Sequence, residues 1–228
     1  GLLRSGLPAS ELVLSSRGYG PELAARHGID LATDNLELVA VADIVLLATR
    51  PCDAVAAVSG LGWRSGQILV SACAGVQLNA LRAAAAPAQV ARIMPLTASS
   101  LGASPTTVYP DLPALRPLLE RLGSVIPLSH EAEFETATVS AAIYGWAQML
   151  IGLGRDWSVA HGMAPDAARR LAAETFVAAG RMIAERPETG EALLQSLVTP
   201  GGITECGLQV LTAEGVEASW QLACDAVL

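Results

Sequence analysis

The stretch of sequence that decides the fold reads Ala42-Asp43-Ile44-Val45-Leu46-Leu47-Ala48-Thr49-Arg50-Pro51. Its centre, residues 44–48, is apolar at every position and lies between Asp43 and Pro51. An apolar run of this length, without polar alternation, is typical of a parallel strand that is covered on both faces of its sheet. The stretch therefore predicts a domain of the α/β class.

Similar short apolar runs recur through the first half of the chain and alternate with short helical segments. We expect further strands at residues 12–15, 67–71, 90–95 and 107–109, and helices at residues 21–27 and 53–58. Strands that alternate with helices predict right-handed crossovers and a parallel sheet.

The pattern changes near Leu128, where strand-like runs stop and Ala-rich helical periodicity begins. We expect helices at residues 136–161, 166–185, 191–198 and 204–211, and a last helix that runs to Leu228. The expected domains are an α/β domain at residues 1–128 and an all-helical domain at residues 129–228. These helices carry more apolar residues than one small bundle can bury, which predicts a second subunit.

Composition excludes several classes of function. The 228 residues are 52% hydrophobic with a net charge of −8, which argues against nucleic acid or an anionic membrane as a partner. No apolar run is long enough to span a membrane and no signal peptide is seen, so a cytoplasmic protein is expected. The four cysteines and three histidines are scattered, which predicts neither a metal site nor a disulfide framework. All 14 basic residues are arginine, so no catalytic lysine is available.

Several segments resemble motifs of the pyrroline-5-carboxylate reductases. Residues 42–51 resemble that family's ADVVLLAVKP, residues 92–95 its RVMPNTP, and residues 171–175 its LAAQT. Residues 198–208 resemble its VTSPGGTTIAGL, of which Pro-Gly-Gly-x-Thr is the most specific piece. The resemblance covers nearly the whole chain, in order and at the expected spacing. It implies a Rossmann-like domain, then a helical domain that interlocks with its twin in a homodimer, and reduction of a cyclic imine by NAD(P)H.

The end of the second Rossmann strand indicates which cofactor is used. An acid there favours NAD, whereas arginine and hydroxyl groups favour the 2′-phosphate of NADP. This chain has Ser15-Ser16-Arg17 and no acid, so we expect Ser16 and Arg17 to select NADPH; the alternative is a solvent-facing turn. Asn35 matches a family residue near the adenosine ribose, and it also suits a helix N-cap. The resemblance places further cofactor contacts at Ala48, Thr49, Arg50, Pro51, Ala74 and Gly75.

The substrate residues are also given by the resemblance. The Thr204 hydroxyl matches a group close to the imine nitrogen, where it could relay a proton; it could equally cap the following helix. Glu205 stands where the family has isoleucine, and it would repel a substrate carboxylate if it points inward or complement the helix dipole if it does not. The family's SGSGPAY reads Ser140 to Trp146 here, with only the serine retained, and Tyr144 could simply be core. The expected substrate contacts are Ser140, Tyr144, Gly201, Gly202, Thr204 and Glu205.

The phosphate-binding motif G-x-G-x-x-G is not found in these 228 residues. In the family it lies just before the segment that matches residues 1–6, and it cradles the pyrophosphate at a helix N-terminus. A first strand is missing with it, so we expect a divergent or N-terminally truncated family member. Two alternatives stay open: a non-catalytic dimeric relative with a degraded site, and an oxidoreductase of the β-hydroxyacid type, which the absence of lysine disfavours.

Overall fold

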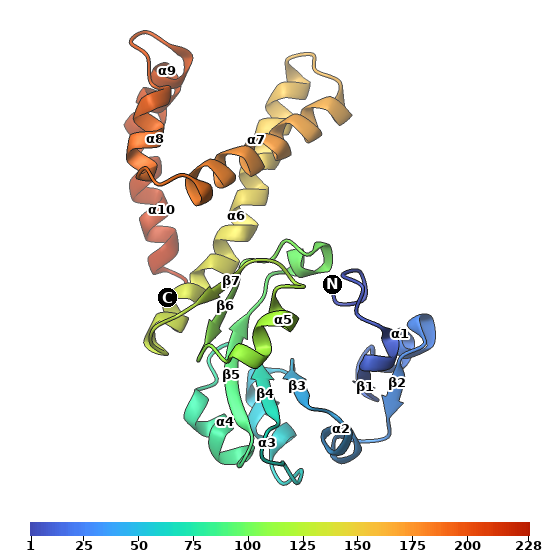
Figure 1. The fold of residues 1–228 in the computed structure, drawn as a ribbon. Helices are drawn as coiled ribbons and strands as arrows, with labels where there is room; N and C mark the ends of the chain where they lie inside the picture. The colour runs from blue at the N-terminus through green and yellow to red at the C-terminus, as the bar shows by residue number, and fades with distance from the viewer. The chain divides into compact units, whose positions relative to one another are not determined.

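A computed structural model describes residues 1–228 and divides the chain into two compact units, Gly1–Thr138 and Val139–Leu228. All the strands lie in the first unit, and the second is entirely helical (Figure 1). This confirms the expected order of an α/β part followed by an all-α part. The break between the units falls inside the long helix α6 (Ala132–Ala160), so its first turns pack with the sheet. The functional division expected at residue 128 stays a prediction.

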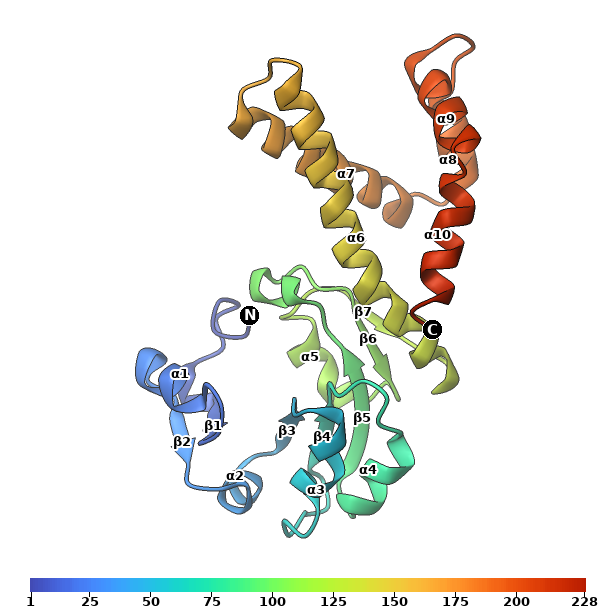
Figure 2. The same cartoon turned by 180° about the vertical axis from the view of Figure 1, so that it is seen from behind.

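The strands form two hydrogen-bonded groups (Figure 2). One group is a parallel pair of β1 and β2, and the other is a five-stranded sheet in the order β3-β4-β5-β6-β7. The five expected strands are confirmed as β1, β3, β4, β5 and β6, whereas the very short β2 and β7 were not expected. The bounds are β1 Val13–Ser15, β2 Asp30–Ala32, β3 Ile44–Leu47, β4 Ile68–Ser71, β5 Gln89–Met94, β6 Thr106–Tyr109 and β7 Val125–Pro127.

The sheet is parallel from β3 to β5, as the sequence predicts, but β6 runs antiparallel to β5. The link between these two strands carries only the 3-10 turn Thr97–Leu101. A parallel return needs a crossover of a dozen or more residues, usually a helix. The expectation of a wholly parallel sheet is therefore wrong at β6.

Both faces of the sheet are covered. On β4, Ile68 and Val70 belong to one buried cluster and Leu69 belongs to the other, which is the alternation that a covered strand requires. Helices α2, α3 and α4 supply the cluster around Leu69, and α5 supplies the other. The helices of this unit are α1 Gly20–His27, α2 Asn35–Val41, α3 Ala54–Val58, α4 Leu78–Ala84 and α5 Arg116–Leu119.

Strand β3 lies at one edge of the five-stranded sheet, although its sequence is that of an interior strand. It pairs only with β4, and its Leu46 is 55% exposed. Strand β1 also pairs on one side only. Strands β1 and β3 therefore each have one edge without a strand partner in the structure.

The helical unit buries very little on its own. Of its residues, only Val139 and Ala168 are buried. Trp146 and Trp220 join α6 to α10 in an edge-to-face contact, with ring centroids 5.4 Å apart. Its other helices are α7 Pro165–Glu185, α8 Gly190–Leu197, α9 Ile203–Ala213 and α10 Val216–Asp225. Large apolar side chains that are more than 60% exposed are Trp157, Ile183, Leu197, Ile203, Val210, Leu222 and Leu228. One protomer therefore lacks the core that its helices need.

Candidate cofactor and substrate site

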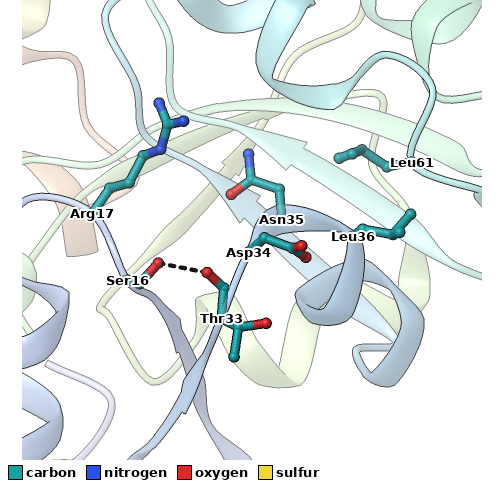
Figure 3. Close-up of a pocket in the computed structure, with 7 residues that line it drawn as sticks. All are labelled: Ser16, Arg17, Thr33, Asp34, Asn35, Leu36 and Leu61. Carbon is teal, nitrogen blue, oxygen red and sulfur yellow. Dashed lines mark hydrogen bonds between the residues drawn. The ribbon is translucent and has the colours of Figure 1, made fainter.

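A hollow of about 480 Å³ lies beyond the carboxyl ends of β1 and β2 (Figure 3). Ligands in α/β domains bind in this position, outside the carboxyl ends of the strands. The structure brings the expected cofactor residues Ser16, Arg17 and Asn35 together here. The lining residues are Ser16, Arg17, Thr33, Asp34, Asn35, Leu36 and Leu61.

Reciprocal hydrogen bonds fix the wall of this hollow at the start of α2. Asp34 caps the helix by accepting from the Glu37 amide at 2.8 Å. Glu37 in return accepts from the Thr33 hydroxyl and amide at 2.6 and 2.7 Å, and these bonds lower the pKa of the Glu37 carboxyl below its ordinary value. The Ser16 hydroxyl donates to the Thr33 carbonyl at 3.1 Å. The loops after β1 and β2 are therefore tied to each other.

One local expectation needs correction at this site. Asn35 is not the N-cap of α2, because Asp34 occupies that position and Asn35 instead donates to the Ala57 carbonyl at 3.2 Å. The loop after β1 carries no acid, and the loop after β2 adds Asp34 to the lining of the hollow. Asp34 is already engaged as a helix cap, whereas Arg17 makes no ion pair in the structure. Arg17 therefore remains the cation available to an anionic group.

The loops after β3 and β4 lie side by side and are joined by a buried thiol. Cys73 contacts the Thr49 carbonyl at 3.3 Å and the Leu47 carbonyl at 3.7 Å. The expected cofactor residues of both loops are exposed: Ala48, Thr49, Arg50, Pro51, Ala74 and Gly75. Gly75 has a φ of 69°, a conformation that favours glycine and brings backbone to the surface. Cys73, which joins the two loops, was not among the residues expected from the sequence.

The Pro-Gly-Gly turn before α9 depends on both glycines. Gly201 has a φ of 72°, which a residue with a side chain rarely adopts. A Cβ on Gly202 would clash with the Thr199 hydroxyl and would lie 2.9 Å from its carbonyl oxygen. Gly202 is also the N-cap of α9, so the suggested capping role of Thr204 is wrong. Thr204 is the second residue of the helix and is half-buried.

Glu205 folds back onto this turn. Its carboxylate accepts from the Gly201 amide at 2.7 Å, one residue before the N-cap Gly202. A backbone amide at a helix N-terminus is a donor that anions use, and here a carboxylate of the chain itself occupies it. Glu205 lies in the first turn of α9, where its charge complements the helix dipole and its carboxylate closes the Pro-Gly-Gly turn. Its effect on the substrate stays a prediction.

The remaining expected substrate residues, Ser140 and Tyr144, lie on α6. They are one turn apart and so share a helix face; Ser140 is exposed and Tyr144 is half-buried. No group of three or more histidine, cysteine, aspartate or glutamate side chains is placed to hold a metal ion. None of the helices is both long and apolar enough to cross a membrane.

Comparison with known proteins agrees with the resemblance. The family model described as pyrroline-5-carboxylate reductase dimerisation matches residues 131–228. A pyrroline-5-carboxylate reductase of Pseudomonas aeruginosa is 28% identical, and the alignment covers 99% of this chain and 88% of that protein. The matched residues thus include both units.

Solved structures show the same fold. A pyrroline-5-carboxylate reductase from Coxiella burnetii has a TM-score of 0.82 at 21% identity, covering 99% of this chain and 89% of the other. A pyrroline carboxylate reductase of Plasmodium falciparum with NADP bound has a TM-score of 0.76 at 19% identity, covering 100% of this chain and 93% of the other. The dimerisation model matches the helical residues and the named reductase aligns with nearly the whole chain, so this chain is similar to the pyrroline-5-carboxylate reductases along its length.

Proposed function

We propose that this protein is an oxidoreductase that acts as a homodimer and reduces a cyclic imine, pyrroline-5-carboxylate to proline, with NADPH. Residues 1–128 would bind the cofactor, and residues 129–228 would form the dimer and bind the substrate. Similarity to pyrroline-5-carboxylate reductases, in the helical residues and along nearly the whole chain, carries the proposal. The test is NADPH consumption by the intact protein with pyrroline-5-carboxylate as substrate, and an inactive but well-folded dimer would favour the non-catalytic alternative.

The hollow beside Arg17 supports NADPH as the cofactor. Arg17 is unpaired and Ser16 lies next to it, and a guanidinium with a hydroxyl group suits a 2′-phosphate. Asn35 would face the adenosine, while the loops at Thr49 and Gly75 would hold the nicotinamide end. The bound cofactor supplies the hydride, and the chain's own part is to hold both ends in place.

Thr204 is the proposed proton-handling residue. Its hydroxyl would hydrogen-bond the imine nitrogen and relay a proton to it. Gly201 and Gly202 would let the backbone of the turn approach the ring, with Ser140 and Tyr144 on the facing side of the substrate. Glu205 would set which substituent the ring can carry at this turn.

Substitution of Arg17 tests the cofactor preference. Arg17→Ala should weaken NADPH binding roughly ten- to a hundredfold, as expected for losing a charge-assisted hydrogen bond, and should leave NADH binding nearly unchanged. The measurement is a fluorescence titration of both cofactors. Arg26→Ala is the control, because Arg26 pairs with Glu22 and does not line the hollow. Equal losses for NADPH and NADH would show that Arg17 is structural.

A second candidate function is reduction of a cyclic imine that carries no carboxylate. The contact between Glu205 and the Gly201 amide favours it, because a negative charge already occupies the turn proposed to face the substrate. Activity on 1-pyrroline and on pyrroline-5-carboxylate, measured side by side, distinguishes the two candidates.

A further inference from the structure

A buried arginine forms the centre of a charged cluster on the first unit. Arg92 of β5 is 1% exposed and contacts Glu131 at 3.0 Å and Glu135 at 3.1 Å. Its guanidinium also lies 4.3 Å from the centre of the Phe134 ring. A buried charge requires such partners, because leaving it unpaired is strongly unfavourable.

Glu131 has a second contact that Glu135 lacks. The same oxygen that meets Arg92 accepts from the amide of Leu78, the first residue of α4, at 2.7 Å. The first amides of a helix have no partner within it, and the N-cap residue Gln77 provides no side-chain cap. The start of α4 is therefore capped from 53 residues away along the chain.

The capped amide closes the loop that contains two of the proposed cofactor residues. Residues 72–77 connect β4 to α4 and include Ala74 and Gly75. At the start of the loop, the Cys73 amide donates to the Ser71 hydroxyl at 3.2 Å, and the Cys73 thiol contacts the Thr49 carbonyl. At the end of the loop, the Glu131 carboxylate holds the Leu78 amide.

We propose that Glu131 is a positioning residue for cofactor binding, which acts by holding the loop of residues 72–77 through the Leu78 amide. This inference rests on the proposed function of that loop. A loop held at both ends loses less conformational freedom when a ligand binds, so affinity is gained without any contact between Glu131 and the cofactor.

Glu135 provides a matched control. It lies in the first turn of α6, which Glu131 directly precedes, and it pairs with the same arginine, but the hydrogen bond to α4 comes from Glu131 alone. Glu131→Ala and Glu135→Ala each remove one carboxylate from Arg92, whereas only Glu131→Ala also frees the Leu78 amide. Glu131→Gln keeps an oxygen that can accept from Leu78 and removes only the charge.

The experiment compares these three variants in the intact protein by NADPH kinetics and by hydrogen exchange at the Leu78 amide. Glu131→Ala should raise the KM for NADPH about tenfold with little change in kcat, and should speed exchange at Leu78 by a similar factor. Glu131→Gln should restore both values to near those of the wild type, and Glu135→Ala should leave both unchanged.

Two results would overturn the inference. One is an equal rise in KM for Glu131→Ala and Glu135→Ala, which would assign the effect to Arg92 alone. The other is unchanged exchange at Leu78 in Glu131→Ala. If the wild type binds no NADPH, the proposed function itself is wrong, and the role of Glu131 in cofactor binding is wrong with it.

Discussion

Glu205→Gln should raise kcat/KM for pyrroline-5-carboxylate by about a hundredfold and change that for uncharged 1-pyrroline by less than about threefold. In the wild type, the Glu205 carboxylate accepts from the Gly201 amide. Two like charges about 4 Å apart repel by about 4 kcal/mol at an effective dielectric of 20, close to three decades in affinity. Solvent around the half-buried Glu205 reduces this, so two decades is the expected gain.

The Glu205→Gln variant removes the charge of the side chain and keeps its shape. Its amide oxygen can still accept from Gly201, so the turn stays closed, whereas Glu205→Ile would introduce the family's residue and remove the contact. Glu191→Gln is the control, because Glu191 lies in the first turn of another helix, α8. Steady-state kinetics under saturating NADPH give the ratio of the two substrates. The prediction is contradicted if the wild type reduces pyrroline-5-carboxylate with a kcat of about 10 s⁻¹ or more and Glu205→Gln has the same kcat. Glu205 would then have no role in substrate selection.

The second large effect is expected on assembly. Leu211→Glu should convert the dimer to a monomer at micromolar concentration and unfold the helical unit. Leu211 is 50% exposed in one protomer and lines an apolar hollow of about 410 Å³ between α9 and α10, with Leu208 and Trp220. A charge buried there by a partner subunit would have no counter-charge, which is strongly unfavourable.

Sedimentation across a concentration series measures this effect. The midpoint temperature of thermal unfolding of the wild type should also rise with protein concentration, because association stabilises the folded state by mass action. Gln209→Glu adds the same charge to the same helix at an exposed polar position and should leave the dimer intact. A wild type that is a stable monomer at micromolar concentration, with an ordered helical unit, would contradict the prediction.

The sequence predicts the elements whose apolar pattern is long or uninterrupted. The run at residues 44–48 and the helices of the second unit are confirmed, with ends displaced by a few residues, because each has a strong periodic signal. Strands β2 and β7 and helices α4 and α5 were missed, since three-residue strands and helices of two turns or fewer are too short to show a period. The direction of β6 depends on the link before it and not on the strand's own residues.

The site was only partly predictable for a different reason. The grouping of Ser16, Arg17 and Asn35 follows from positions at strand ends, which a motif can indicate. Leu61 lines the same hollow from a distant loop, and no local sequence pattern predicts this position. The contacts of Glu131 with Arg92 and Leu78 likewise join residues 39 and 53 positions apart, and the closing of the turn by Glu205 depends on a single rotamer.

The buried Arg92 also determines where the first unit can be cut. A fragment ending at residue 128 would contain the whole sheet yet leave this guanidinium inside it with neither carboxylate, since Glu131 and Glu135 come later in the chain. Removing the partners of a buried charge is strongly destabilising. A fragment that ends at Thr138 keeps both carboxylates and the Phe134 ring. By the same reasoning, during synthesis the sheet cannot fold stably until the first turns of α6 have left the ribosome.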